Sequence, residues 1–198
     1  VMKTFGLVVP KGAGTIFEAN VRRLLDGADA VAAIVLPLLE SWRAVRARAA
    51  ELDRQLLAVA RASTNCRRLM TVPGVGAVVA ASFVAAVETP ENLTTSRAVG
   101  AWIGLTPRRY QSGQVDDDGP ISRRGDARLR ALLYEAATAM LTRVQGESEL
   151  RRWGLALRKR LGFKRAAVAL ARKLAVVMHA MWKKGADFNP KAATSAAT

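Results

Sequence analysis

Residues 35–59 read VLPLLESWRAVRARAAELDRQLLAV, and their apolar positions decide the fold of the N-terminal part of the chain. These positions are separated by alternating steps of three and four residues, through Val35, Leu38, Trp42, Val45, Ala49, Leu52, Leu56 and Val59. Such alternation is the seam of a coiled coil, with charged residues such as Arg43 and Asp53 off the seam. Pro37 interrupts it early and predicts a helix start or a kink.

The seam needs a partner, and two partners fit the pattern. The preceding stretch, around residues 16–25, is also helical in character and could pair with the seam within one chain. A second subunit could pair with it equally well. We therefore expect a linker over residues 1–14 and coiled-coil helices over residues 15–64, and the sequence favours neither partner.

The rest of the chain predicts a helical domain over residues 65–185 and a disordered tail over residues 186–198. Asp126 is a good N-cap for a helix whose inner face would be Leu129, Leu132, Leu133, Ala136, Ala137, Met140 and Leu141. A last helix over about 164–183 would turn inward Ala167, Ala171, Leu174, Met178 and Met181. Residues 112–125 are expected to be a loop. Strand signals are weak, so the predicted fold class is all-α.

The charge of the chain points to a polyanionic partner. Its 198 residues include 31 Lys and Arg against 16 Asp and Glu, a formal net charge of +15. Residues 108–184 hold 18 basic and 7 acidic side chains, whereas residues 1–107 hold 12 and 8. A basic half of this kind is typical of nucleic-acid binding. A basic protein without a nucleic-acid role is the alternative.

Other features exclude several classes of protein. Cys66 is the only cysteine, so the chain has no internal disulfide and no cysteine-based metal site. The longest apolar run, residues 31–39, is too short to span a membrane, and the first residues lack the apolar core of a signal peptide. We therefore expect a cytoplasmic protein without a membrane partner.

A glycine-rich turn precedes an apolar helix near the middle of the chain. Residues 73–76 read Pro-Gly-Val-Gly between two helical segments, as in the hairpin of a helix-hairpin-helix module. Gly74 and Gly76 would let backbone N–H groups face a phosphate of a nucleic acid without reading its sequence. A tight turn between helices without a ligand is the alternative.

Two serines lie among arginines further along the chain. Ser112 follows Arg108 and Arg109, which could stabilise charge on a phosphoryl group that the serine attacks. No proton acceptor lies near it in the sequence, since the single histidine is His179. From local chemistry alone, a surface serine in a turn is therefore the simpler interpretation.

Ser122 begins a second basic cluster. It could contact a phosphate or cap the following helix, and Arg123, Arg124 and Arg128 resemble a phosphate clamp, with Arg130 in the first turn of that helix. A solvated basic turn is the alternative. The acidic run at residues 116–118 has no partner carboxylate at metal-binding spacing, so we predict no metal site.

Taken in order, these motifs resemble a known family. They are Pro73-Gly74-Val75-Gly76, Ala101-Trp102-Ile103-Gly104-Leu105-Thr106-Pro107, Gln111-Ser112-Gly113, Gly119-x-Ile121-Ser122-x-x-Gly125-Asp126 before Leu129-Arg130, and the late helix with Val168-Ala169-Leu170-Ala171-Arg172-Lys173. The set resembles the C-terminal half of the bacterial insertion-sequence transposases of the "one-ten" type. Two differences are Arg123 in place of the usual lysine and an acidic insert at residues 115–118.

The resemblance implies a recombinase that moves a DNA element through a covalent serine–DNA intermediate. The family's nucleophile would correspond to Ser112. Family members also carry an N-terminal RuvC-like domain that binds Mg²⁺, work as oligomers, and use a structured guide RNA to choose DNA partners. We expect this chain to be a C-terminal part or truncated copy of such a transposase, oligomeric through its coiled coil and inactive without the RuvC-like domain. Mg²⁺ would belong to that domain.

Two other functions fit the residues. A non-catalytic helix-hairpin-helix protein would bind nucleic acid in a salt-sensitive way, and Ser112→Ala would change nothing. A purely structural helical oligomer would not bind nucleic acid at physiological salt.

Overall fold

The structure is a computed structural model that describes residues 1–112 and 115–191, and the side chains of residues 109–118 lie outside what it describes. The chain divides into two compact units, Val1–Gln55 and Leu56–Thr198. Each unit is considered by itself. The structure is mainly helical, and the long helix α2 (Asp29–Ala62) precedes a helical domain, as the sequence predicts.

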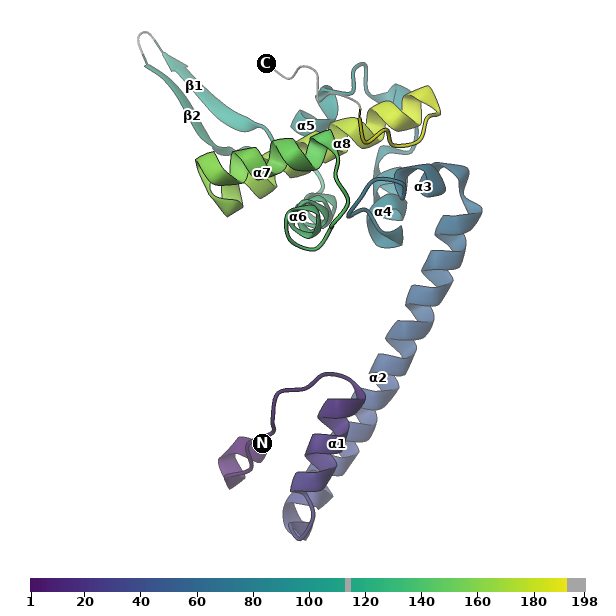
Figure 1. The fold of residues 1–198 in the computed structure, drawn as a ribbon, viewed down its shortest axis with the longest axis vertical. Coiled ribbons are helices and arrows are strands. Elements are labelled where there is room, and N and C mark those ends of the chain that lie inside the picture. The colour runs from purple at the N-terminus through teal and green to yellow at the C-terminus, as the bar shows by residue number, and fades with distance from the viewer. Residues whose placement is uncertain (113–114, 192–198) are drawn as a thin grey trace. The chain divides into compact units, whose positions relative to one another are not determined.

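The first unit is a helical hairpin. A short 3-10 helix, η1 (Met2–Phe5), precedes α1 (Thr15–Leu24), which packs against the first part of α2 (Figure 1). Its small core consists of Val21, Leu25, Val35 and Leu39, with Phe17 and Trp42 at its edge. Pro37 lies inside α2 rather than at its start.

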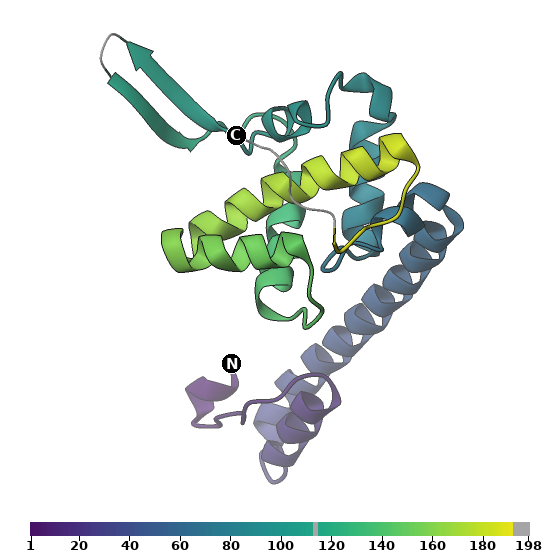
Figure 2. The same cartoon turned by 45° about the horizontal axis from the view of Figure 1, so that its top comes forward.

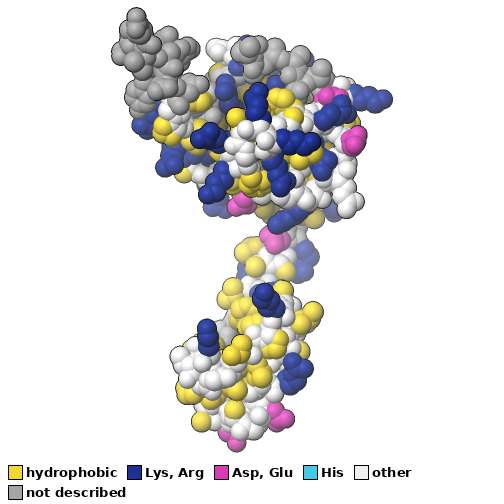
Figure 3. All heavy atoms as spheres, turned by 60° about the vertical axis from the view of Figure 1, so that its left-hand side comes forward, with side chains coloured by type: hydrophobic (Ala, Val, Ile, Leu, Met, Phe, Trp, Pro, Cys, Tyr) yellow, Lys and Arg dark blue, Asp and Glu magenta, His cyan; other side chains and the backbone are white. Residues whose placement is uncertain are grey.

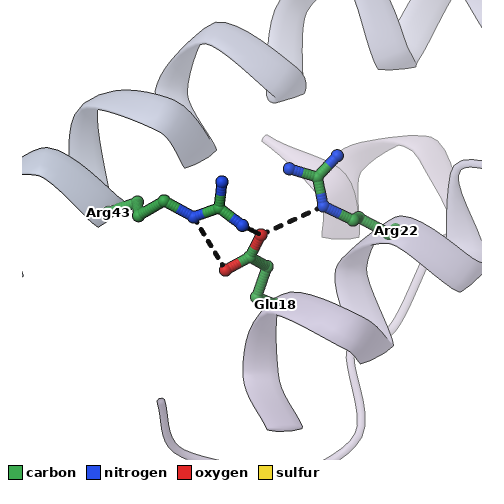
Figure 4. Close-up of polar contacts among 3 residues, drawn as sticks. All are labelled: Glu18, Arg22 and Arg43. Carbon is green, nitrogen blue, oxygen red and sulfur yellow. Dashed lines mark hydrogen bonds and ion pairs between the residues drawn. The ribbon is translucent and has the colours of Figure 1, made fainter. Parts of the chain in front are cut away.

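A carboxylate joins the two helices of this hairpin. Glu18 of α1 accepts a hydrogen bond from Arg22 Nε one turn further along α1, at 3.1 Å, and another from Arg43 Nε of α2, at 3.3 Å (Figure 4). The hydrogen bond from Arg22, aided by Arg43, lowers the pKa of the Glu18 carboxyl. These contacts and the core make α1 the intramolecular partner of the first half of the predicted seam.

Three apolar residues in the second half of the predicted seam are exposed to solvent. Val45, Leu52 and Val59 keep 69%, 52% and 66% of their surface. Leu38 is exposed in the same way, at 55%, whereas its neighbour Leu39 is buried against α1. The α1 helix lies against the α2 face that carries Val35, Leu39 and Trp42, so two of the seam positions, Val35 and Trp42, pack in this hairpin.

The second unit is built around its last helix, α8 (Phe163–Lys184). This helix packs against four other helices of the unit, which are α3 (Thr64–Leu69), α5 (Ala98–Trp102), α6 (Ala127–Thr142) and α7 (Glu149–Leu161). The helix α4 (Ala77–Val87) packs on α3 and α6, and the 3-10 helix η2 (Pro90–Asn92) contacts α8. Figures 1 and 2 both show α7 and α8 lying side by side.

The predicted faces of α6 and α8 are confirmed. The Asp126 carboxylate caps α6 by accepting hydrogen bonds from the N–H groups of Arg128 and Leu129, at 2.8 and 3.0 Å. All predicted inward residues of α6 except the half-buried Leu132 are buried, as are all five of α8.

The expected loop at residues 112–125 is wrong. The strands β1 (Pro107–Ser112) and β2 (Val115–Ile121) form an antiparallel hairpin, which extends away from the helices in both views (Figure 2). Pro107 pairs with Ile121 and Ser112 with Val115, with an irregularity between Pro107 and Arg109. The strands contain polar residues at successive positions, so they lack the apolar alternation that predicts a half-buried strand.

Residues 186–191 of the expected disordered tail include segments that are bonded to the helical domain. The N–H of Glu149 donates to the carbonyl of Pro190 at 2.9 Å, and the N–H of Phe188 donates to Thr71 Oγ1, also at 2.9 Å. Phe188 also packs against the core of the unit. Residues 192–198 lie outside the described part. Within the described part of the chain, no helix has the length and apolar character that crossing a membrane needs.

Candidate nucleic-acid interface

Two glycine loops cross in direct backbone contact where the hairpin joins the helices. Gly104 and Gly125 have φ values of 77° and 78°, in the region that favours glycine. A Cβ on Gly104 would lie 2.1 Å from the carbonyl oxygen of Arg124, and one on Gly125 would lie 2.1 Å from that of Trp102. Both glycines are therefore needed for the crossing, which we call the loop crossing (residues 102–106 and 122–125).

Hydrogen bonds fix the loop crossing from both sides. The N–H of Ser122 donates to Thr106 O at 2.9 Å, and the N–H of Arg123 donates to Gly104 O at 3.1 Å. Arg130 Nη1 donates to Ile103 O at 2.7 Å and to Arg124 O at 3.0 Å. Arg130 therefore bridges the two loops, and a nucleic-acid contact for this residue stays a prediction.

The N-terminus of α6 is capped by the carboxylate of Asp126. Because Asp126 accepts hydrogen bonds from two of the first N–H groups of α6, these amides are satisfied within the chain. The alternative in which Ser122 caps this helix is therefore wrong. Any phosphate bound here would be held by side chains rather than by the helix N-terminus.

The side chains that could hold a phosphate are on the outer side of the loop crossing. Arg123, Arg124 and Arg128 are exposed. Arg123 has a φ of 56°, a strained conformation for a residue with a side chain, and the Gly104 hydrogen bond holds its backbone there. Arg108 Nη2 donates to Ser122 O at 3.3 Å, which ties the base of β1 to the same loop.

The structure describes only the backbone of the proposed nucleophile. Ser112 is the last residue of β1 and lies opposite Val115 in the register. The side chains of Ser112 and Arg109 lie outside the described residues, as does Gly113. The roles expected for Ser112 and Arg109 therefore stay predictions.

The glycine turn between α3 and α4 has two different environments. Gly74, with φ 86°, approaches α6 so closely that a Cβ would lie 2.8 Å from Ala136 O. Gly76 precedes the first residue of α4, and a Cβ there would meet nothing within 4 Å. Gly74 thus serves helix packing, whereas Gly76 leaves the start of α4 open.

The single histidine has a structural setting. His179 of α8 is fully buried, with Nδ1 2.9 Å from Ser96 Oγ and Nε2 3.0 Å from Pro90 O. A neutral ring satisfies both contacts by accepting at Nδ1 and donating at Nε2. Burial lowers the pKa of His179, which favours that neutral form. The histidine joins η2 and the segment before α5 to α8.

A basic groove over α8 was not predicted from the sequence. The groove has a volume of about 1400 Å³, and α8 supplies the largest share of its lining. Figure 3 shows Lys and Arg side chains spread among apolar ones over the visible face of this unit. The signal was present in the sequence, since α8 carries basic residues on the helix face that does not enter the core, at Lys164, Arg165, Arg172, Lys173 and Lys184.

The comparison with protein families identifies the second unit. Residues 66–152 match the family described as "Transposase IS116/IS110/IS902 family". The matched segment runs from α3 into α7 and includes both serines, the hairpin and the loop crossing. The chain carries a domain of the IS116/IS110/IS902 transposase family at residues 66–152. Its matched part is the serine-containing C-terminal region that the sequence motifs predict.

Individual transposases support this assignment. The chain is 39% identical to the transposase for insertion sequence element IS1111A of Coxiella burnetii over 65% of the chain and 36% of that protein. It is 33% identical to a probable family 20 transposase of Pseudomonas aeruginosa, over 77% of the chain and 46% of that protein. A transposase of Sinorhizobium fredii, y4pF/y4sB, is 32% identical over 93% of the chain and 49% of its own length. The chain thus spans less than half of each of these transposases.

Proposed function

We propose that this chain is the serine-bearing, nucleic-acid-binding part of a transposase that moves a DNA element through a serine–DNA intermediate. The observation that carries the proposal is the family match over residues 66–152, because it covers the serine hairpin together with its arginine-rich base. The exposed guanidinium groups of Arg123, Arg124 and Arg128 support a polyanionic ligand at this place.

The proposed reaction is a transesterification at phosphorus. The Ser112 hydroxyl oxygen would attack a phosphodiester in line with the leaving oxygen, forming a serine–phosphate bond as the bond to that oxygen breaks. The proton lost by serine would reach the leaving oxygen, which departs as a DNA hydroxyl. One phosphodiester replaces another, so no external energy source is required. Arginines at the hairpin base would stabilise the negative charge on phosphorus oxygens.

We further propose that the reaction needs parts of the transposase beyond this chain. The chain spans less than half of each of the three transposases described above, and a RuvC-like domain with Mg²⁺, a structured guide RNA and further subunits are its proposed partners. Among the described residues, no group of three His, Cys, Asp or Glu side chains could hold a metal ion. No step is therefore assigned to a metal within this chain.

The exposed half of the α2 seam supports self-association. Val45 and Leu52 are apolar and exposed in a helix whose neighbouring turns carry charges. This pattern is typical of a coiled-coil helix whose partner helix comes from another chain. We propose that this stretch pairs with the same stretch of another subunit.

A non-catalytic nucleic-acid-binding protein is a second candidate. It is favoured by the start of α4, where Gly76 is exposed and makes no side-chain cap, since uncapped N–H groups at a helix start suit a phosphate. In that case the chain would bind DNA without any covalent product.

Adduct formation separates the two candidates. The chain is mixed with duplex DNA of the element ends, the flanking RNA and a separately produced RuvC-like domain of a family member, with Mg²⁺. Products are run on a denaturing gel with labelled DNA. A labelled band that migrates with the protein supports the transposase, and its loss in Ser112→Ala but not in Ser122→Ala supports the assigned nucleophile. Salt-sensitive binding without any adduct, from the same correctly folded mixture, contradicts the covalent mechanism and supports the second candidate.

A further inference from the structure

The groove over α8 is lined by residues from several elements of the second unit. Its lining comes from α8, from the segment before α5 at Ser96 and Arg97, from the hairpin base at Pro107 and Pro120, and from Trp153 of α7. The segment after α8, around Phe188, adds a further edge. Because α8 rises about 1.5 Å per residue, the distance from Lys164 to Lys184 along the groove is about 30 Å.

The charge of the groove is strongly one-sided. Among its described lining residues, one is a carboxylate, Asp187, which faces Arg68 outside the lining at 3.9 Å. Six lining residues are cationic, namely Arg97, Lys164, Arg165, Arg172, Lys173 and Lys184. A groove lined by one sign of charge concentrates ligands of the opposite sign.

Three of these cations form a cluster between α5 and α8. Gly100 of α5 is buried, and a Cβ there would lie 2.9 Å from Arg172 Cγ and 3.0 Å from Arg172 Nε. Because Gly100 has no side chain, the aliphatic part of Arg172 can lie across α5. Partial burial, followed by the positive charges of Arg97 and Arg172, lowers the pKa of Lys173. Cations gathered this closely attract a polyanion.

The surface between the cations is apolar. Val168, Ala169, Val176 and Ala180 belong to the lining and alternate with the basic residues along α8. Trp153 adds an aromatic ring, and it is half-buried. A duplex turns its base faces inward and would leave such a surface unused. A single strand offers both phosphates for the cations and unstacked bases for the apolar surface.

We propose that the groove over α8 binds a single-stranded segment of nucleic acid, with its phosphates on the Arg97, Arg172 and Lys173 cluster. The exposed arginines of the loop crossing, Arg123, Arg124 and Arg128, are not among the described lining residues of this groove. The proposal rests on the nucleic-acid-binding function given above. It adds a second site and a defined ligand form, an unpaired strand.

The first test is binding of labelled oligonucleotides by fluorescence anisotropy at low salt. The probes are a 20-nucleotide oligothymidine and a 20-base-pair duplex. The groove variant is Arg172→Gln with Lys173→Gln. The matched control is Arg48→Gln with Arg61→Gln, which removes the same charge at exposed positions of α2. We expect the groove variant to bind the single strand at least about tenfold more weakly than the control, with a salt slope lower by about 1.4.

Each other outcome of this test has a defined meaning. If the groove variant and the control bind the single strand alike, the groove proposal is wrong and the proposed function stands. Equal weakening for the duplex contradicts a site for an unpaired strand. If the unmodified chain binds neither probe at low salt, the proposed nucleic-acid function fails, and the groove proposal fails with it.

A second test needs no variant and so does not depend on folding of a mutant. Lysines of the unmodified chain are acylated with and without the oligothymidine, and the modified peptides are measured by mass spectrometry. We expect the oligothymidine to protect Lys164, Lys173 and Lys184 from acylation. Lys159 of α7, an exposed lysine outside the lining, is the control and should not be protected. Protection by polyglutamate and not by oligothymidine would show an acidic protein partner and overturn the proposal.

Discussion

Gly104 and Arg124 touch through their backbones, since a Cβ on Gly104 would lie 2.1 Å from the carbonyl oxygen of Arg124 and 2.4 Å from its amide nitrogen. Residues twenty positions apart are thereby held in a single crossing from which the β1–β2 hairpin extends. This contact positions the arginines at the base of the hairpin. The geometry of the candidate site therefore depends on Gly104 having no side chain.

Gly104→Ala is expected to destabilise the second unit by more than about 2 kcal/mol, because it adds a backbone clash to a left-handed φ. Urea unfolding followed by circular dichroism measures the change. The matched control is Gly146→Ala, since Gly146 is exposed and a Cβ there would meet nothing within 4 Å. Equal stability of the two variants would show that the crossing does not have the described geometry.

Arg130→Ala is expected to cost about 1.5 to 3 kcal/mol, because it removes the charged donor shared by Ile103 O and Arg124 O. Arg128→Ala removes an exposed arginine two residues earlier and is expected to change stability by less than about 0.5 kcal/mol. Denaturant titrations of both variants give the comparison. A larger cost for Arg128→Ala would contradict the bridging role of Arg130.

The buried His179 predicts a pH dependence of stability. Its pKa is lowered in the folded chain, whereas an unfolded histidine titrates near 6.5. Below that pH the unfolded state binds a proton that the folded state does not bind. Stability is therefore fully present above pH 6.5 and falls as the pH drops toward the folded pKa, by at most about 1.4 kcal/mol per pH unit. Below both pKa values the loss is complete.

His179→Gln should lack this loss, because glutamine does not titrate. Urea unfolding of both proteins between pH 8 and pH 5 checks it. Parallel pH curves for the two proteins would mean that His179 is not held neutral.

Self-association is expected to depend on the exposed half of the α2 seam. Val45→Glu with Leu52→Glu should shift the chain toward the monomer, because charges replace apolar seam positions. Sedimentation velocity over a range of concentrations measures the shift. Ala44→Glu with Ala50→Glu adds the same charge at exposed positions outside the seam. Loss of association in both variants would point to charge repulsion rather than to the seam.

The sequence predicts the helices of this chain better than its connections. Apolar spacing identified the inner faces of α6 and α8, because a helix buried on one side must repeat its apolar residues every three to four positions. The β1–β2 hairpin escaped prediction because its strands lack that kind of signal. The shift from Leu38 to Leu39 in the core reflects the packing of α1, which the spacing in α2 alone does not contain.

The candidate site was predictable in part for a similar reason. The arginines around Ser122 are adjacent in sequence, so their clustering was visible. The crossing that brings Gly104 to Arg124 and the groove cluster of Arg97 with Lys173 join residues far apart in the chain. Such contacts follow from tertiary packing. A helical projection of α8 would have shown its basic outer face, but not the residues of other elements that lie opposite this face.

The most direct test of the central claim is to locate the DNA on the protein. The adduct formed in the complete mixture is digested with nuclease and trypsin, and the peptide that carries the nucleotide is fragmented in a mass spectrometer. Trypsin leaves both serines on one peptide, residues 110–123, so the fragment ions must separate them. The account predicts a nucleotide on Ser112. A nucleotide on Ser122 or on any other residue would contradict it.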